Sequence, residues 1–144
     1  MWDGSVTRPS TAELAVGRSF PDDGSSVGDA RVWATGTLGG WGLAPHSQLS
    51  DDIVLCVSEL VSNTIQHAQS ASDVEMRLDH GTILLMVTDQ RSDLRIPLDP
   101  VTDAVTGRSG HGLGILGYLA SRWGVNYSPV DQQSKTVWCQ FDHR

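Results

Sequence analysis

The sequence predicts an α+β fold of two layers, with helices on one face of a mixed, mostly antiparallel sheet. Residues 51–68, near the middle of the chain, carry apolar side chains at helical spacing. Residues 74–80 and 83–88 then have the pattern of strands joined by a short turn, and the C-terminal residues resemble a second strand pair. Strands joined by short turns pair antiparallel, so this order of elements favours the fold class.

Length and composition limit the kinds of protein this chain can be. Its 144 residues suit one domain, with a flexible leader expected at 1–14 and the folded domain at 15–144. No apolar run approaches the length of a membrane span, so we expect a cytoplasmic protein without a membrane partner. The net charge of −7 argues against a nucleic-acid partner, because phosphate backbones are bound by clustered Lys and Arg. Cys56 and Cys139 are too few for a disulfide framework, and we expect buried thiols.

The first two expected elements are a strand over 15–20 and a helix of low intrinsic propensity. Ser25 or Ser26 is the expected N-cap of this helix. Its apolar residues recur at intervals of three and four, at Val27, Ala30, Ala34, Leu38 and Trp41. A group of glycines starting at Gly39 ends it. Tertiary packing has to stabilise such a helix, because propensity alone does not.

Residues 51–68 are the clearest helical segment. Ser50 is the expected N-cap, and acidic residues in the first turn complement the helix dipole. On the opposite side from the apolar residues, Glu59, Asn63 and His67 form a row at i, i+4 and i+8. The apolar stripe consists of Ile53, Val57, Leu60, Val61, Ile65 and Ala68.

The remaining elements follow from alternation and from turn residues. Residues 83–88 are a nearly continuous apolar run suited to a central strand, preceded by a hairpin turn at Gly81-Thr82. Residues 92–109 are broken by prolines and a glycine and are expected to be a loop. Residues 113–123 have helical spacing. The chain closes with a hairpin of 125–128 and 135–141, in which three residues face one way: Val137, Cys139 and Phe141.

Glu59 and Asn63 are candidates for phosphoryl-transfer chemistry. A carboxylate on a helix, beside a metal-bound phosphate, can orient or deprotonate an attacking hydroxyl. An amide one turn further on can give an oxygen to Mg²⁺, which prefers hard oxygen ligands. Taken by itself, the helix fits a solvated polar face better, so the functional interpretation depends on further motifs.

Residues 110–114, Gly-His-Gly-Leu-Gly, are a candidate phosphate-binding loop. Glycine lets the backbone approach a phosphate, and the helix that follows offers free N–H groups and a positive dipole end. The alternative is a flexible turn, since the segment matches neither the Walker nor the dinucleotide pattern. Asp89, after the central strand, can accept a hydrogen bond from the exocyclic amine of a base or can simply end the strand. His67 and His111 are candidate phosphate neighbours or surface histidines.

Four segments in order, 59–68, 87–89, 110–115 and 135–138, resemble the sequence boxes of the GHKL ATPase superfamily. The resemblance runs from about 20 to 141. Within the superfamily, the chain is most similar to the RsbW-type anti-sigma-factor serine kinases, in particular the small stand-alone forms of actinomycetes. The resemblance implies a two-layer GHKL (Bergerat-type) sandwich, with ATP and Mg²⁺ as cofactors.

The resemblance also implies roles for individual residues. Glu59 matches the general base, Asn63 the Mg²⁺ ligand, and Asp89 the carboxylate that binds adenine. Residues 100–109 match a mobile lid. The further residues expected around ATP are His67, Arg108, Gly110, His111, Gly112, Leu113, Gly114 and, on the adenine side, Thr136.

Members of this family phosphorylate a serine of an anti-anti-sigma partner of the STAS type, sequester a sigma factor and commonly form dimers. The resemblance therefore implies a serine/threonine protein kinase with these partners. The chain departs from the family in the first glycine box, Asp-x-Gly-x-Gly, because Gln-Arg-Ser-Asp follows Asp89, and in the last box, which reads Ser-Lys-Thr at 134–136. These departures motivate a second interpretation, a non-catalytic or nucleotide-free module that sequesters a sigma factor or a STAS protein. A detached histidine-kinase catalytic domain ranks third, because no segment resembles a dimerisation helix pair.

Overall fold

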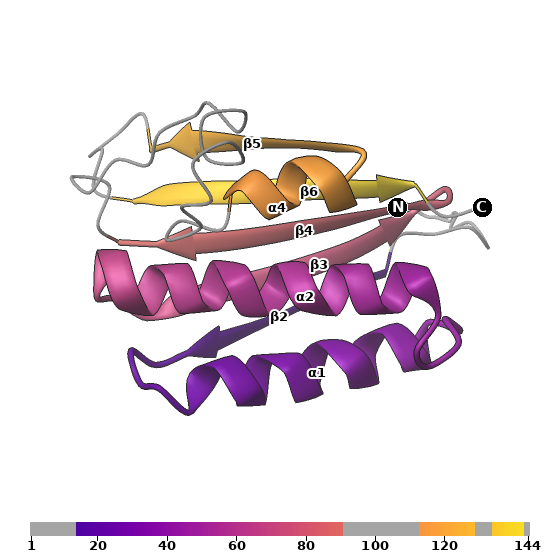
Figure 1. Cartoon of the computed structure of the whole chain (residues 1–144), viewed down its shortest axis with the longest axis horizontal. Helices are drawn as coiled ribbons and strands as arrows, with labels where there is room; N and C mark the ends of the chain where they lie inside the picture. Colours follow the sequence, from indigo (N-terminus) through magenta and orange to yellow (C-terminus); the bar gives the residue numbers. More distant parts are fainter. Residues whose placement is uncertain (1–13, 91–112, 129–133, 143–144) are drawn as a thin grey trace, which may run out of the picture.

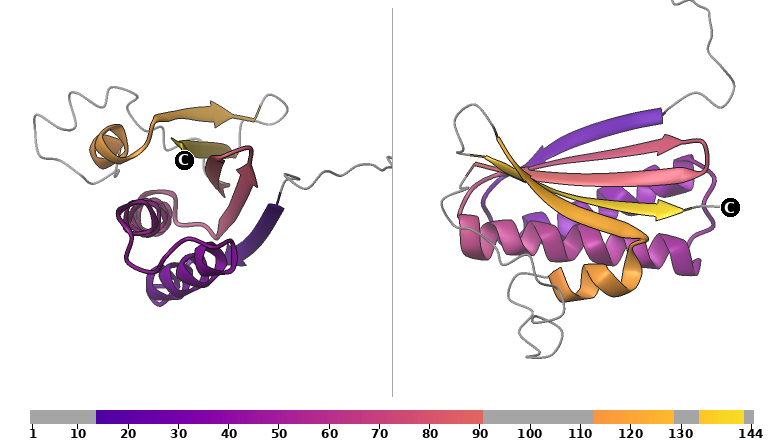
Figure 2. Two further views of the ribbon diagram at one scale, coloured as in Figure 1. Left: turned by 90° about the vertical axis from the view of Figure 1, so that its right-hand side faces the viewer. Right: turned by 90° about the horizontal axis from the view of Figure 1, so that it is seen from above.

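The computed structural model describes residues 14–90, 113–128 and 134–142. Within these ranges one sheet is covered on one face by helices, which confirms the predicted two-layer α+β class (Figures 1 and 2). The elements in chain order are β2 (Leu14–Phe20), α1 (Ser26–Gly40), α2 (Gln48–Asn63), a π-helical turn (Thr64–Ala68), β3 (Ser72–Asp79), β4 (Thr82–Asp89), α4 (Leu113–Leu119), β5 (Arg122–Tyr127) and β6 (Lys135–Asp142).

The sheet has the strand order β2-β3-β4-β6-β5, with β4 at its centre as predicted. Each pairing between the described strands is antiparallel, so this part of the sheet is antiparallel and not mixed. The turn between β3 and β4 lies at His80 and Gly81, one residue before the predicted position. Both residues are in the left-handed region, with φ of 51° and 79°, as a tight two-residue hairpin turn requires.

The core lies between the helices and the sheet. Alternate residues of β3, β4 and β6 face it, and the predicted inward residues of the last strand are buried: Val137, Cys139 and Phe141. The apolar stripe of α2 packs on them, with Ile53, Val57, Leu60, Val61 and Ala68 buried and Ile65 partly buried. At the end of β2, the Phe20 ring meets Trp33 of α1 edge-on, with centroids 5.8 Å apart. None of the helices in the described ranges is long and apolar enough to cross a membrane.

The first helix, α1, is stabilised by packing, as its weak propensity predicts. Its buried apolar residues are four apart, at Ala30, Ala34 and Leu38, and this face lies against the core beside α2 (Figure 1). Of the two predicted N-caps, Ser25 and Ser26, the structure has Ser25, although its side chain makes no capping hydrogen bond.

The second helix, α2, begins at Gln48, earlier than predicted. Its N-cap is Ser47, whose backbone is extended and whose hydroxyl accepts a hydrogen bond from the Ser50 amide at 3.2 Å. Ser50, the predicted cap, is buried in the first turn. Both serines have capping chemistry, and only the backbone conformation decides between them.

The helix α4 ends at Leu119, whereas the sequence predicted a helix to Trp123. Trp123 lies in β5, since the backbone bonds to β6 from Ser121 onward. The Ser121 amide donates to the Gln140 carbonyl at 2.8 Å. Strand pairing at the sheet edge therefore overrides the helical spacing of the apolar residues.

Candidate functional site

Several candidate residues gather at one end of the two layers (Figures 1 and 2). α2 ends there, β4 ends there at Asp89, and β6 begins there at Lys135, which is the register partner of Asp89. α4 begins toward the same end and packs beside α2. The fold thus brings together candidates that are far apart in sequence.

Glu59 and Asn63 lie one turn apart near the end of α2 but differ in exposure. Asn63 is buried, with only 5% of its surface exposed. Its Oδ1 has no hydrogen-bond partner among the described residues. The alternative interpretation, a solvated polar face, therefore does not hold for Asn63, because this side of α2 turns inward there. A buried amide oxygen without a partner is unusual in a folded protein, so it suggests a position meant for a ligand.

Glu59 is partly exposed and lines a hollow of about 440 Å³ between α1 and α2. Arg31 of α1 and Ser62 of α2 line the same hollow. A carboxylate at the wall of an open hollow can be reached from outside the molecule. Glu59 is therefore accessible from outside the molecule, while Asn63 one turn away faces inward.

His67 lies in the π-helical turn that follows α2. The turn contains one more residue than an α-helical turn, and it closes where the Gln69 amide donates to the Thr64 carbonyl at 2.8 Å. His67 is partly buried at the end of the molecule that carries Asn63. The extra residue rotates His67 out of the regular row with Glu59 and Asn63 that the sequence predicted.

Asp89 and Lys135 form a buried ion pair between Lys135 Nζ and Asp89 Oδ2. Each residue has only 3% of its surface exposed. Lys135 is also the only lysine in the sequence. Sequence reasoning missed this contact. Alternation along β6 contained the signal, because Lys135 falls on the same face as the core residue Val137.

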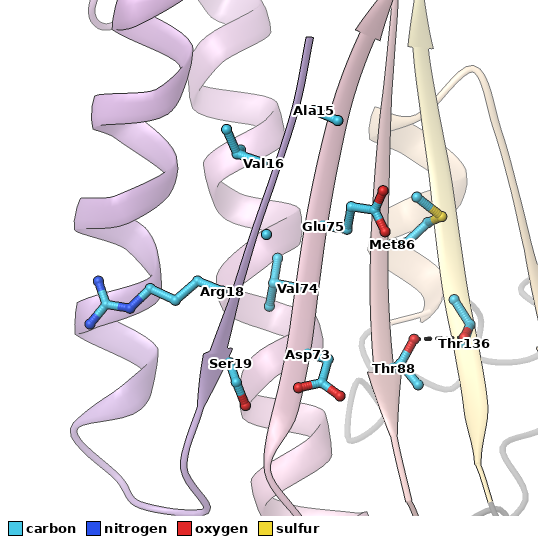
Figure 3. Close-up of a pocket in the computed structure, with 11 residues that line it drawn as sticks. Ala15, Val16, Arg18, Ser19, Asp73, Val74, Glu75, Met86, Thr88 and Thr136 are labelled. Atoms are coloured by element: carbon cyan, nitrogen blue, oxygen red, sulfur yellow. Dashed lines mark hydrogen bonds between the residues drawn. The ribbon is translucent and has the colours of Figure 1, made fainter. Parts of the chain in front are cut away.

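Thr136, the predicted adenine-side contact, faces the other side of the sheet. Its hydroxyl is hydrogen-bonded to that of Thr88, with the two oxygens 2.7 Å apart (Figure 3). Both threonines line a shallow hollow of about 680 Å³ on the open face of the sheet, together with Glu75 and Met86. The structure therefore brings Lys135, and not Thr136, to Asp89.

The other predicted ATP contacts belong to the central loop and the start of α4. Arg108, Gly110, His111 and Gly112 lie outside the described residues, as does the expected lid. Leu113 begins α4 and Gly114 follows it in the first turn.

A family described as the histidine kinase-like ATPase domain matches residues 20–141, which span β2 to β6 with the site between them. This chain belongs to that family. Membership of the histidine kinase-like ATPase family implies that the chain binds ATP. A comparison with curated proteins found no match.

Among solved structures, this chain is similar to a chain that holds the RsbU and RsbW domains of Rv1364c from Mycobacterium tuberculosis. The superposition has a TM-score of 0.68 and 15% sequence identity, and it covers 90% of this chain. This chain spans 32% of the length of that chain. At this identity the likeness concerns the fold.

Proposed function

We propose that this chain is an ATP-dependent serine/threonine protein kinase of the RsbW anti-sigma type. Its substrate would be a serine of a STAS-type anti-anti-sigma protein. The observation that carries the proposal is the pair on α2, where Glu59 reaches an open hollow and Asn63 faces inward one turn away. This arrangement supports the proposal, because a partner's hydroxyl could reach the Glu59 carboxylate while the Asn63 amide points to the interior, where a nucleotide's phosphates and their metal ion would lie.

In the proposed reaction, the serine oxygen attacks the γ-phosphorus of ATP. The bond from that phosphorus to the β–γ bridging oxygen breaks, and ADP leaves with the electron pair. Glu59 accepts the proton of the serine hydroxyl, so that the attacking oxygen does not carry a positive charge. The partly exposed position of Glu59 supports this role, because the hydroxyl belongs to another protein.

Asn63 fits a magnesium ligand. Its Oδ1 is buried and has no hydrogen-bond partner within the described part of the chain, and Mg²⁺ takes hard oxygen donors of this kind. When bound, Mg²⁺ would neutralise charge on the phosphates. The end of α2 holds the Asn63 side chain inward, so that its amide oxygen would be available to the metal ion.

The proposed partners follow from the same class of protein. A STAS protein would present its serine at the hollow between α1 and α2, where Arg31 offers a positive charge. Binding of a sigma factor, a homodimer and a cytoplasmic location belong to the proposal as well. The structural likeness to a chain that contains an RsbW domain supports the class of partner.

Transfer of radiolabelled γ-phosphate from ATP to a STAS partner tests the proposal. Glu59→Gln removes the proton acceptor but keeps the size of the side chain, so we expect transfer to be lost while ATP binding persists. Ser62→Ala, a change at the same hollow, is the matched control and should retain transfer. Full transfer by the Glu59→Gln variant would exclude the assigned base.

The ion pair between Asp89 and Lys135 favours a second candidate function. A carboxylate already paired with a lysine is less available to a base, which agrees with a non-catalytic module that sequesters a sigma factor or a STAS protein. Calorimetry with Mg²⁺ and ATP separates the two candidates. Absence of binding at millimolar ATP would favour the module.

A further inference from the structure

We propose that Lys135 determines base specificity by reading the purine edge together with Asp89. The inference rests on the proposed function, because it assumes that ATP binds at this end of the sheet. It assigns to Lys135 a role beyond neutralising Asp89. The lysine donates a hydrogen bond to the ring nitrogen N1 of adenine, while the carboxylate accepts one from the adjacent 6-amino group.

The position of Lys135 carries the argument. Asp89 is the last residue of β4 and Lys135 the first of β6, and the two are register partners on the helix-covered face of the sheet. Lysine is among the residues least often buried, yet the single lysine of this chain is 97% covered. Its place is thus fixed by the sheet, next to the carboxylate expected to bind adenine.

The hydrogen-bonding capacity of the pair matches the edge of adenine. An ammonium group has three N–H donors, and the ion pair with Asp89 uses one of them. A carboxylate has about four lone-pair sites, so it can accept several hydrogen bonds at once. Adenine presents a donor at its 6-amino group and an acceptor at N1 beside it. Asp89 and Lys135 offer the complementary acceptor and donor side by side.

Charge gives a second reason for a lysine at this position. A lone buried carboxylate would be costly to desolvate. The pair of Lys135 and Asp89 is neutral overall, and it faces a base that is also neutral. The pair therefore recognises the base by its pattern of hydrogen-bond donor and acceptor, and not by net charge. Hypoxanthine reverses that order, because it has a carbonyl oxygen at position 6 and an N–H at N1.

Calorimetry on the unmodified protein tests the inference with three nucleotides: ATP, 1-deaza-ATP, which lacks the N1 acceptor, and ITP, which carries hypoxanthine. We expect 1-deaza-ATP to bind about 10- to 100-fold more weakly than ATP, the loss typical of one hydrogen bond to a charged group. ITP should bind more weakly still. Equal affinity for ATP and 1-deaza-ATP would overturn the role of Lys135 and leave the kinase proposal intact. Absence of ATP binding would overturn both.

Two further measurements use the single lysine. Protein labelled with ¹⁵N-lysine has one side-chain ammonium signal, and we expect ATP to shift it much more than 1-deaza-ATP does. The Lys135→Met variant should bind the two nucleotides equally, whereas Arg77→Met, which removes an exposed cation elsewhere on the sheet, should keep the difference. Tighter ATP binding by Lys135→Met would show that the lysine competes with the base, and it would overturn the inference. If Lys135→Met fails to fold, the nucleotide series and the ammonium signal still test the inference, because both use the unmodified protein.

Discussion

The indole ring of Trp138 lies over Gly124, its register partner on the neighbouring strand. A Cβ placed on Gly124 would come within 2.7 Å of the ring, closer than real atoms approach. The glycine therefore gives room for the aromatic ring on the open face of the sheet. This pairing also explains why β5 tolerates a glycine in its interior.

Gly124→Ala is expected to destabilise the protein by about 1–2 kcal/mol, because the ring must leave its place over the strand. Urea unfolding followed by circular dichroism measures the change. Gly36→Ala is the control, since its Cβ would meet nothing within 4 Å on the exposed side of α1. That substitution should stabilise the helix by about 0.5–1 kcal/mol. Equal effects of the two substitutions would contradict the steric explanation.

Asn63→Leu is expected to raise the free energy of unfolding by about 1 kcal/mol while abolishing phosphoryl transfer. The change removes a buried amide oxygen that has no partner among the described residues. Thr64→Val is the matched control on the next residue, where the buried hydroxyl donates to the Leu60 carbonyl at 3.1 Å. Losing that satisfied bond should cost about 1 kcal/mol. If both variants lower the free energy of unfolding by similar amounts, the native Asn63 does not cost the protein stability, and the prediction is wrong.

Breaking the ion pair between Asp89 and Lys135 from one side should cost about 3–5 kcal/mol, because one buried charge is left without its partner. Lys135→Met leaves the Asp89 carboxylate without its partner, and Asp89→Asn leaves the Lys135 ammonium without its own. The double variant leaves no buried charge and should be more stable than Lys135→Met alone. Thermal and urea unfolding of the four proteins give the coupling energy. Additive losses would mean that the two groups do not interact in solution.

The stability of the protein should fall at alkaline pH because of Cys139. Its hydrogen bond with Cys56 and its burial both raise the pKa of the Cys139 thiol in the folded state. In the unfolded chain the pKa of a cysteine is about 8.5. The contribution of the protonated thiol to the free energy of unfolding is therefore complete below that pH and decreases above it. The expected slope is about 1.4 kcal/mol per pH unit. Unfolding from about pH 8 to about pH 10 should show a smaller slope in Cys139→Ala. An unchanged slope would exclude this thiol as the cause.

Much of the fold could be predicted from the sequence, because it depends on periodicity. The α2 stripe and the inward residues of β6 follow from helical and alternating spacing, and they are buried except for Ile65, which is partly buried. The end of α4 could not be predicted, since its residues keep helical spacing up to Trp123 and only pairing with β6 draws the chain into the sheet. The choice of Ser47 over Ser50 as N-cap likewise depends on backbone conformation.

The candidate site was harder to predict than the fold. Glu59, Asn63 and Asp89 were identified from motifs, and the fold carries them toward one end of the molecule. Lys135 was not identified, because its contact with Asp89 depends on the register of two strands that are 46 residues apart. Single-sequence patterns fix which face a residue takes but not its neighbour across a sheet.

The π-helical turn Thr64–Ala68 adjusts the length of chain between a helix and a strand. Two phases must be satisfied at once: α2 has to end with Asn63 turned inward, and β3 has to begin with Val74 toward the core. Helix and strand repeat with different periods, so a whole number of residues seldom meets both conditions. One surplus residue in the turn takes up the mismatch. Deleting a residue there would therefore change both the direction of the Asn63 amide and the face that β3 presents to the core.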